Sequence, residues 1–153
     1  MKFADIPDSP VIYASDVFLG ILVNLSKKFA DPQKLLSIRA HNSRLQGIFY
    51  SLKMADQKYD VMEPFVFSDS GPFPYCPVLE EAINQLILGG CISYPFTTDW
   101  EVIVLLPAGE KFFEEEGGDR FCKEELEEIE DIANHIYTLG VINQDPLSQL
   151  ARV

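Results

Sequence analysis

The chain has 153 residues, 47% of them hydrophobic, and its 24 acidic and 12 basic residues give a formal net charge of −12 at pH 7. This length and apolar content predict one domain, residues 1–153, that buries a core of its own. The longest apolar run, Val17–Val23, is far shorter than the roughly 20 residues that cross a bilayer, and the acidic balance disfavours binding that depends on nucleic-acid phosphates.

The N-terminus and the cysteines predict a cytoplasmic protein. Residues 1–10 (MKFADIPDSP) have acids and prolines where a secretory signal peptide has basic residues and then an apolar run. Cys76, Cys91 and Cys122 form an odd, scattered set without a CxxC pair, which disfavours a disulfide framework.

Hydrophobic spacing predicts three helices in the first part of the chain. The first has Ser15 or Asp16 as its N-cap and runs to about Phe29. Asp31-Pro32 is a start signal for the second, and a break at 41–43 precedes the third. The expected buried positions are Val17, Phe18, Ile21, Leu22, Leu25 and Phe29, then Leu35, Leu36 and Ile38, then Leu45, Ile48, Phe49 and Leu52. Residues 64–68 (PFVFS) predict a short edge strand.

Residues 70–106 predict a helix followed by a two-stranded hairpin. Pro77 suits the first helical turn, because its missing N–H would have no intrahelical partner there, and Gly89-Gly90 can end the helix. Residues 91–95 and 101–106 have the composition of strands, and the loop between them is short enough for a hairpin. The apolar stripe of the helix is Leu79, Ala82, Ile83, Leu86 and Ile87. This pattern is the second half of a winged helix-turn-helix, so we expect an α+β, mainly helical fold with extra N- and C-terminal helices and a core of about 15–116.

The last long helix is predicted over Cys122–Leu139, after a short segment that holds Phe112 and Phe113. Its apolar residues recur at intervals of four and three: Cys122, Leu126, Ile129, Ala133 and Ile136. Such a seam packs either on the core or on a second copy of the chain, as a homodimer through 122–139. The acids of 124–131 form either a solvated helix face or a site for a basic partner. Asp145-Pro146 predicts a short terminal helix.

A family resemblance covers roughly residues 32–113. Residues 44–52 (RLQGIFYSL), the turn Gly71-Pro72-Phe73 and the helix that ends in Gly90-Cys91-Ile92 resemble the Panacea or SocA-like antitoxin domain. That family has an RLQKLLYLL-type helix, a YGP turn and a helix that ends in GLI before a wing, and Ser70 here stands where the family has Tyr. The resemblance implies a winged helix that holds a toxin or another protein.

The chain carries no motif that predicts catalysis. His41 and His135 belong to no HExxH or HxxxH pattern, and the nucleotide-binding and nucleophile patterns GxGxxG, GxxxxGK[ST] and GxSxG are absent. Cys76 at a helix start is either a thiol activated by the helix dipole or a capping or core residue. We therefore expect no enzyme, no catalytic residue, no metal and no cofactor.

The distribution of charge separates two functional interpretations. Between Tyr59 and Glu110 there is no Lys or Arg, although this range contains the predicted helix and hairpin. A DNA-binding regulator would need cations there to contact phosphates. We therefore expect a protein-interaction module, and the family resemblance implies that it is antitoxin-like or an adaptor in a toxin–antitoxin or defence locus. A DNA-binding transcriptional regulator is the alternative.

Each interpretation has its own set of residues. Partner binding uses the aromatic residues around the turn and wing, a residue type enriched in interface hot spots, and two acids of the helix. These are Tyr75, Tyr94, Phe96, Trp100, Glu80 and Glu81. DNA binding uses the basic residues of the first part and two amides of the helix, namely Lys27, Lys28, Lys34, Arg39, Arg44, Asn84 and Gln85. The aromatic residues could equally pack under the wing.

Overall fold

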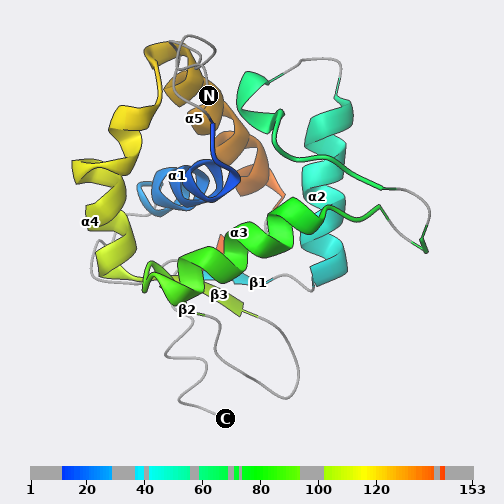
Figure 1. The fold of residues 1–153 in the computed structure, drawn as a ribbon, viewed down its shortest axis with the longest axis horizontal. Coiled ribbons are helices and arrows are strands. Elements are labelled where there is room, and N and C mark those ends of the chain that lie inside the picture. Colours follow the sequence, from blue (N-terminus) through cyan, green and yellow to red (C-terminus); the bar gives the residue numbers. More distant parts are fainter. Residues whose placement is uncertain are drawn as a thin grey trace, which may run out of the picture.

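The computed structural model describes residues 12–28, 37–39, 42–55, 59–68, 71–72, 74–93, 102–139 and 142–143, with backbone alone at 37–39, 42–44, 102 and 142–143. Within these ranges lie five α-helices, two short 3-10 helices and four strands (Figure 1). In chain order they are α1 (Ala14–Ser26), β1 (Ser37–Arg39), α2 (Asn42–Met54), η2 (Asp60–Met62), α3 (Pro77–Leu88), β2 (Ile92–Ser93), β3 (Val102–Leu105), α4 (Pro107–Glu115), η3 (Gly117–Arg120), α5 (Lys123–Thr138) and β4 (Ile142–Asn143). The protein is therefore α+β and mainly helical, as the sequence predicts.

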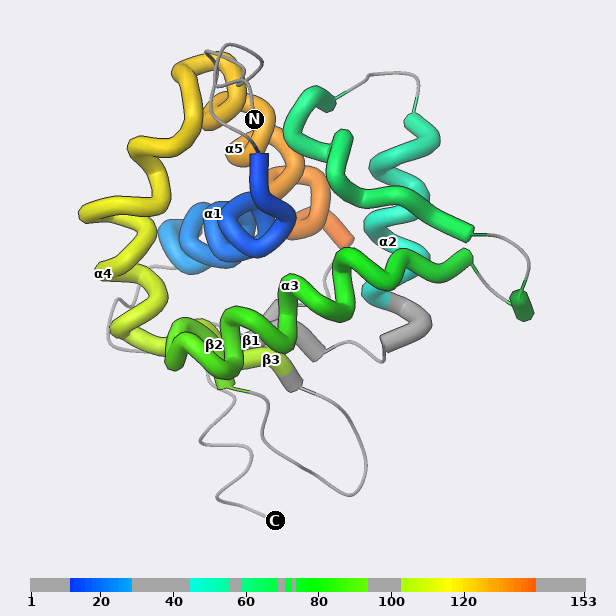
Figure 2. The backbone as a smooth tube through the Cα atoms, in the orientation of Figure 1, coloured from blue at the N-terminus to red at the C-terminus, as the bar shows by residue number. Residues whose placement is uncertain are grey.

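Helix α1 lies at the centre of the molecule and contacts α3, α4 and α5 (Figure 2). The buried residues of α1 are Ala14, Asp16, Val17, Phe18, Leu19, Gly20, Ile21, Leu22, Val23 and Leu25. They cover every side of the helix, which is the pattern of a helix enclosed by others. The predicted cap is wrong, because the helix begins at Ala14 and its N-cap is Tyr13, without a side-chain cap bond.

The close approach of α1 to its neighbours depends on Gly20. A Cβ at this position would lie 2.9 Å from the Phe113 ring of α4 and 3.2 Å from the Ile129 side chain of α5. A larger residue would therefore force the Phe113 ring and the Ile129 side chain to shift within the core.

One carboxylate lies within this core. The Asp16 side chain of α1 is only 7% exposed, and its Oδ2 accepts a hydrogen bond from Arg120 Nη1 of η3 at 2.9 Å. A buried charge without a partner is costly, so this ion pair keeps Asp16 compatible with the core. The hydrogen bond that Arg120 donates to Asp16 raises the pKa of the Arg120 guanidinium, which also lies 5.6 Å from the centroid of the Phe112 ring. Asp16 thus joins α1 to η3.

The four strands form one antiparallel sheet in the order β2-β3-β1-β4. Ile92 lies opposite Leu105, so the hairpin predicted after the helix is confirmed. The prediction of a helix that includes Ile38 is wrong for residues 37–39. These residues form strand β1, which pairs with β3 on one side and with β4 on the other. Pairing on both edges outweighs the local helix signal of Asp31-Pro32, as strand formation depends strongly on context.

Helix α2 packs against α1 and the segment after η2 through three aromatic rings. Its Phe49 ring lies 5.7 Å from that of Phe18 on α1 and 5.3 Å from that of Phe65. The predicted stripe of α2 is largely confirmed, because Leu45, Phe49 and Leu52 are buried and Ile48 partly so. Residues 64–68, predicted as a strand, form a single bridge among the described residues, between Ser68 and Tyr75.

Helices α4 and α5 complete the enclosure of α1. Helix α5 matches its predicted range closely, and the N–H of its N-cap, Cys122, donates a hydrogen bond to Glu125 Oε1 at 2.8 Å. Phe113 of α4 is buried, as are four residues of α5, namely Ile129, Ile132, Ala133 and Ile136. The helix predicted after Asp145 lies outside the described residues. No helix in the described ranges is long and apolar enough to span a membrane.

Candidate functional site

Helix α3 is anchored to α2 by a buried glutamine. Gln46, which is 0% exposed, accepts a hydrogen bond from the Cys76 N–H at 2.7 Å and donates one to the Cys76 carbonyl at 3.2 Å. Because Cys76 is the N-cap of α3, the two bonds fix the start of this helix. Sequence reasoning missed this role. The available signal was that Gln46 lies three residues before Phe49, at the border of an apolar stripe.

The thiol of Cys76 is a core group. Cys76 is 0% exposed, and its side chain forms no cap hydrogen bond. Burial raises the pKa of this thiol, so it stays protonated at neutral pH. The structure therefore favours the core alternative over an activated nucleophile. No three His, Cys, Asp or Glu side chains in the described part of the chain are grouped so that they could hold a metal ion.

Two residues of the predicted partner-binding set contact each other. The Tyr75 hydroxyl donates a hydrogen bond to Glu80 Oε2, and the Tyr75 backbone forms the bridge to Ser68. Both Tyr75 and Glu80 are half-buried, so they serve first to hold the start of α3. The other three aromatic residues of that set lie outside the described residues: Tyr94, Phe96 and Trp100.

The exposed side of α3 is a continuous stripe, here called the α3 face. It consists of Glu81, Asn84, Gln85 and Leu88, at positions i, i+3, i+4 and i+7. Gln85 Nε2 lies 3.5 Å from Glu81 Oε1, and Leu88 is 87% exposed. The sequence analysis assigned Glu81 to partner binding and Asn84 and Gln85 to the DNA-binding alternative, and it missed Leu88. The signal for Leu88 was its place off the buried stripe, directly before Gly89.

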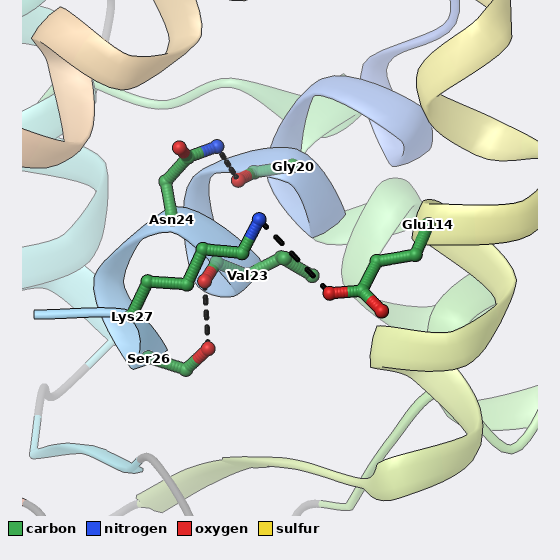
Figure 3. A network of polar contacts seen from close by, with 6 residues as sticks. All are labelled: Gly20, Val23, Asn24, Ser26, Lys27 and Glu114. Atoms are coloured by element: carbon green, nitrogen blue, oxygen red, sulfur yellow. Dashed lines mark hydrogen bonds and ion pairs between the residues drawn. The ribbon is translucent and has the colours of Figure 1, made fainter. Parts of the chain in front are cut away.

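The basic residues of the DNA alternative are partly engaged within the chain. Lys27 Nζ at the end of α1 lies 4.0 Å from Glu114 Oε1 of α4 (Figure 3), and Lys28 Nζ lies 5.9 Å from the centroid of the Tyr137 ring. Lys34 lies outside the described residues. The backbones of Arg39 and Arg44 belong to β1 and α2, and their side chains are not described. Each of these two lysines therefore has a contact within the chain, and the ion pair of Lys27 is exposed to solvent.

Part of the acidic run of α5 holds the fold. Asp131 Oδ2 accepts a hydrogen bond from the Tyr59 hydroxyl at 2.5 Å, and Glu128 Oε1 accepts one from the Val61 N–H at 3.1 Å. Burial and the hydrogen bond with Asp131 raise the pKa of Tyr59 to about 12. These two acids therefore tie η2 to α5.

The apolar residues that recur along α5 at intervals of four and three, here called its four-three seam, lie largely against the rest of the chain. Ile129 and Ala133 are 0% exposed and Ile136 is 1% exposed, on the helix that packs against α1. Three of the five seam residues therefore pack on the core. A homodimer through 122–139 would have to use the exposed side of α5 and stays a prediction.

Comparison with known proteins gives no relative: no protein-family model, no curated protein and no solved structure matches this sequence. The α3 face, the contacts of Gln46 and the distribution of charge therefore carry the functional argument.

Proposed function

We propose that this chain is a winged-helix module that binds another protein through the α3 face. Support for the winged helix comes from the order α1–β1–α2–α3–β2–β3, in which β1 pairs with β3 and β2 and β3 form the hairpin. On this assignment α4 and α5 are C-terminal additions that enclose α1, and Gln46 holds α3 in place through Cys76.

The observation that carries the proposal is the composition of the α3 face. Leu88 is 87% exposed, and a leucine side chain that becomes buried on association contributes about 1.5–3 kcal/mol. Beside it lie the amides of Asn84 and Gln85 and the carboxylate of Glu81, with no basic residue from 59 to 110. A protein with an apolar recess and hydrogen-bond donors around it fits this face.

The resemblance of residues 32–113 to the SocA-like antitoxin domain supports a partner class. On that basis the partner is a toxin or a nuclease encoded in a toxin–antitoxin or defence locus. The chain itself acts by holding the partner, without chemistry of its own.

A DNA-binding regulator is the second candidate, because Asn84 and Gln85 are both exposed on the same face. Such amides can recognise the edge of adenine in the major groove. Glu81 lies between them and the helix start, however, and its carboxylate would repel the phosphates. Because the chain has no Lys or Arg from residue 59 to residue 110, α3 and its neighbouring segments supply no cation to offset that repulsion. Protein binding is therefore the better-supported function.

The test compares two substitutions of exposed apolar residues. The tagged protein is used to capture its partner from the native host, and the partner is identified and purified for affinity measurement. Leu88→Asp should weaken binding about tenfold or more, whereas Met54→Asp, at a 57% exposed position on α2, should leave affinity unchanged within about twofold. Circular dichroism must show both variants folded.

Two results would refute the proposal. One is equal affinity of wild type and Leu88→Asp for the purified partner. The other is nanomolar binding to duplex DNA that falls steeply with salt and is lost in Asn84→Ala, which would establish the regulator instead.

A further inference from the structure

A hollow of about 630 Å³ opens between the end of α1, helix α4, η3 and the first half of α5. Its floor is apolar, formed by the ring of Phe113, which is 7% exposed, and by the half-buried side chain of Leu126. Six of the ten lining residues are exposed, so the hollow is an open groove. A small apolar ligand in this groove would keep much of its surface exposed to water, whereas a segment of another protein chain can lie across it.

Carboxylates dominate the rim of this hollow. They are Glu114 of α4, Asp119 of η3, and Glu127 and Glu130 of α5. Two lysines, Lys27 and Lys123, oppose these four acids, which leaves a formal charge of −2 at the rim. The acids come from three elements, so the fold gathers them in one place. Unlike Glu128 and Asp131, the acids at 119, 127 and 130 have no side-chain hydrogen bond or ion pair with another described residue.

The interaction that crosses the hollow is weak. Lys27 Nζ and Glu114 Oε1 lie 4.0 Å apart, and their side chains are 58% and 51% exposed. Figure 3 shows Lys27 reaching from α1 towards α4, while the Asn24 amide turns back to the Gly20 carbonyl of its own helix, at 2.8 Å. Exposed ion pairs of this kind contribute about 0–1 kcal/mol. A cationic side chain from outside could therefore replace Lys27 at Glu114 with little loss.

We propose that this hollow is a second docking surface, which receives a basic segment of a partner protein. An apolar side chain of the segment contacts Phe113 and Leu126, and the lysines or arginines beside it meet the rim carboxylates. Charge complementarity selects a basic segment over an acidic one, and it disfavours a nucleic acid, whose phosphates would meet the same carboxylates. No residue of the α3 face takes part, so this surface goes beyond the proposed function and either one can fail alone.

The experiment uses the full chain and three short synthetic peptides. The first has one central leucine flanked by lysines and arginines, the second has serine in place of that leucine, and the third has glutamates in place of the bases. Amide chemical shifts of the ¹⁵N-labelled protein locate the binding, and a titration gives the affinity. The first peptide should shift the signals of Gly118 and Leu126. The second should bind more weakly, and the third should not bind.

Two double variants distinguish binding at this hollow from non-specific attraction between a basic peptide and an acidic protein. Glu127→Lys with Glu130→Lys should weaken the first peptide about tenfold, because two attractions become repulsions. Glu115→Lys with Glu124→Lys makes the same change in net charge at exposed positions outside the hollow, and it should change affinity by less than about twofold. Three results would overturn the proposal: equal weakening by the two double variants, shifts confined to the α3 face, or no binding at about 1 mM peptide.

Discussion

The two hydrogen bonds of Gln46 should contribute measurably to stability, and Gln46→Met tests this. Methionine has a similar length but no amide, so the Cys76 N–H loses the acceptor that it has at 2.7 Å. The Cys76 carbonyl keeps the N–H groups of Leu79 and Glu80, at 3.2 and 3.5 Å, and is not left unsatisfied. One buried donor without a partner costs about 1–3 kcal/mol. Part of this cost is offset by the burial of an apolar side chain, so we expect a net loss of about 1–2 kcal/mol.

Urea unfolding followed by circular dichroism at pH 7 measures this loss, and hydrogen exchange locates it. The amides of Leu79 and Glu80 should exchange faster in Gln46→Met, because the start of α3 is no longer tied to α2. Gln85→Met is the matched control at an exposed position of α3 and should stay within about 0.5 kcal/mol of wild type. If Gln46→Met is as stable as the control, the Gln46 contacts do not hold α3.

Two further predictions concern α5 and its contact with η2. Ile129→Glu places a carboxylate at a position that is 0% exposed and close to Gly20, so circular dichroism should show loss of the fold; a folded monomer obtained from a wild-type dimer would contradict the packing described here. Tyr59 should ionise near pH 12 by ultraviolet titration, and titration near 10 would refute its bond to Asp131. The raised pKa means that folding favours the neutral phenol. Its contribution is therefore intact below about pH 10 and lost as the pH rises towards 12, a loss that Tyr59→Phe should remove.

The sequence predicted the elements that carry their own start, stop and periodic signals. Pro77, the stripe from Leu79 to Leu86 and Gly89 lie within one short stretch and gave α3 correctly. The hairpin followed because its two strands are close in sequence. The C-terminal helix was found within one residue at each end, because its apolar spacing is regular and acids fill its first turns.

The features that sequence reasoning missed depend on contacts between residues that are far apart in the sequence. Residues 37–39 become a strand because β3 and β4 pair with them from far along the chain. Asp16 is of a residue type that often caps helices, but in the fold its carboxylate lies beside Arg120 instead. The role of Gln46 likewise depends on Cys76, 30 residues further on. No local pattern encodes such partners.

The candidate site could be predicted from the sequence only where helical periodicity determines which residues are exposed. Glu81, Asn84 and Gln85 were placed correctly on the exposed side of a helix by its periodicity. The exposure of Leu88 depends on where the helix ends relative to the core. The hollow could not be foreseen at all, because α4, η3 and α5 bring its rim together only in three dimensions.

The acids of this chain fall into two groups by what they contact, and the difference bears on its partners. Asp16, Glu128 and Asp131 bond to groups of the fold, so they contribute to stability through their partners. Glu127 and Glu130 face solvent on the same helix and repel each other across one turn. A basic segment in the hollow would replace that repulsion with attraction, which adds to the free energy of binding. Salt screens both effects, so it should stabilise the free protein slightly while it weakens the complex. If the chain acts as the proposed module, this charge favours basic protein partners over phosphate backbones.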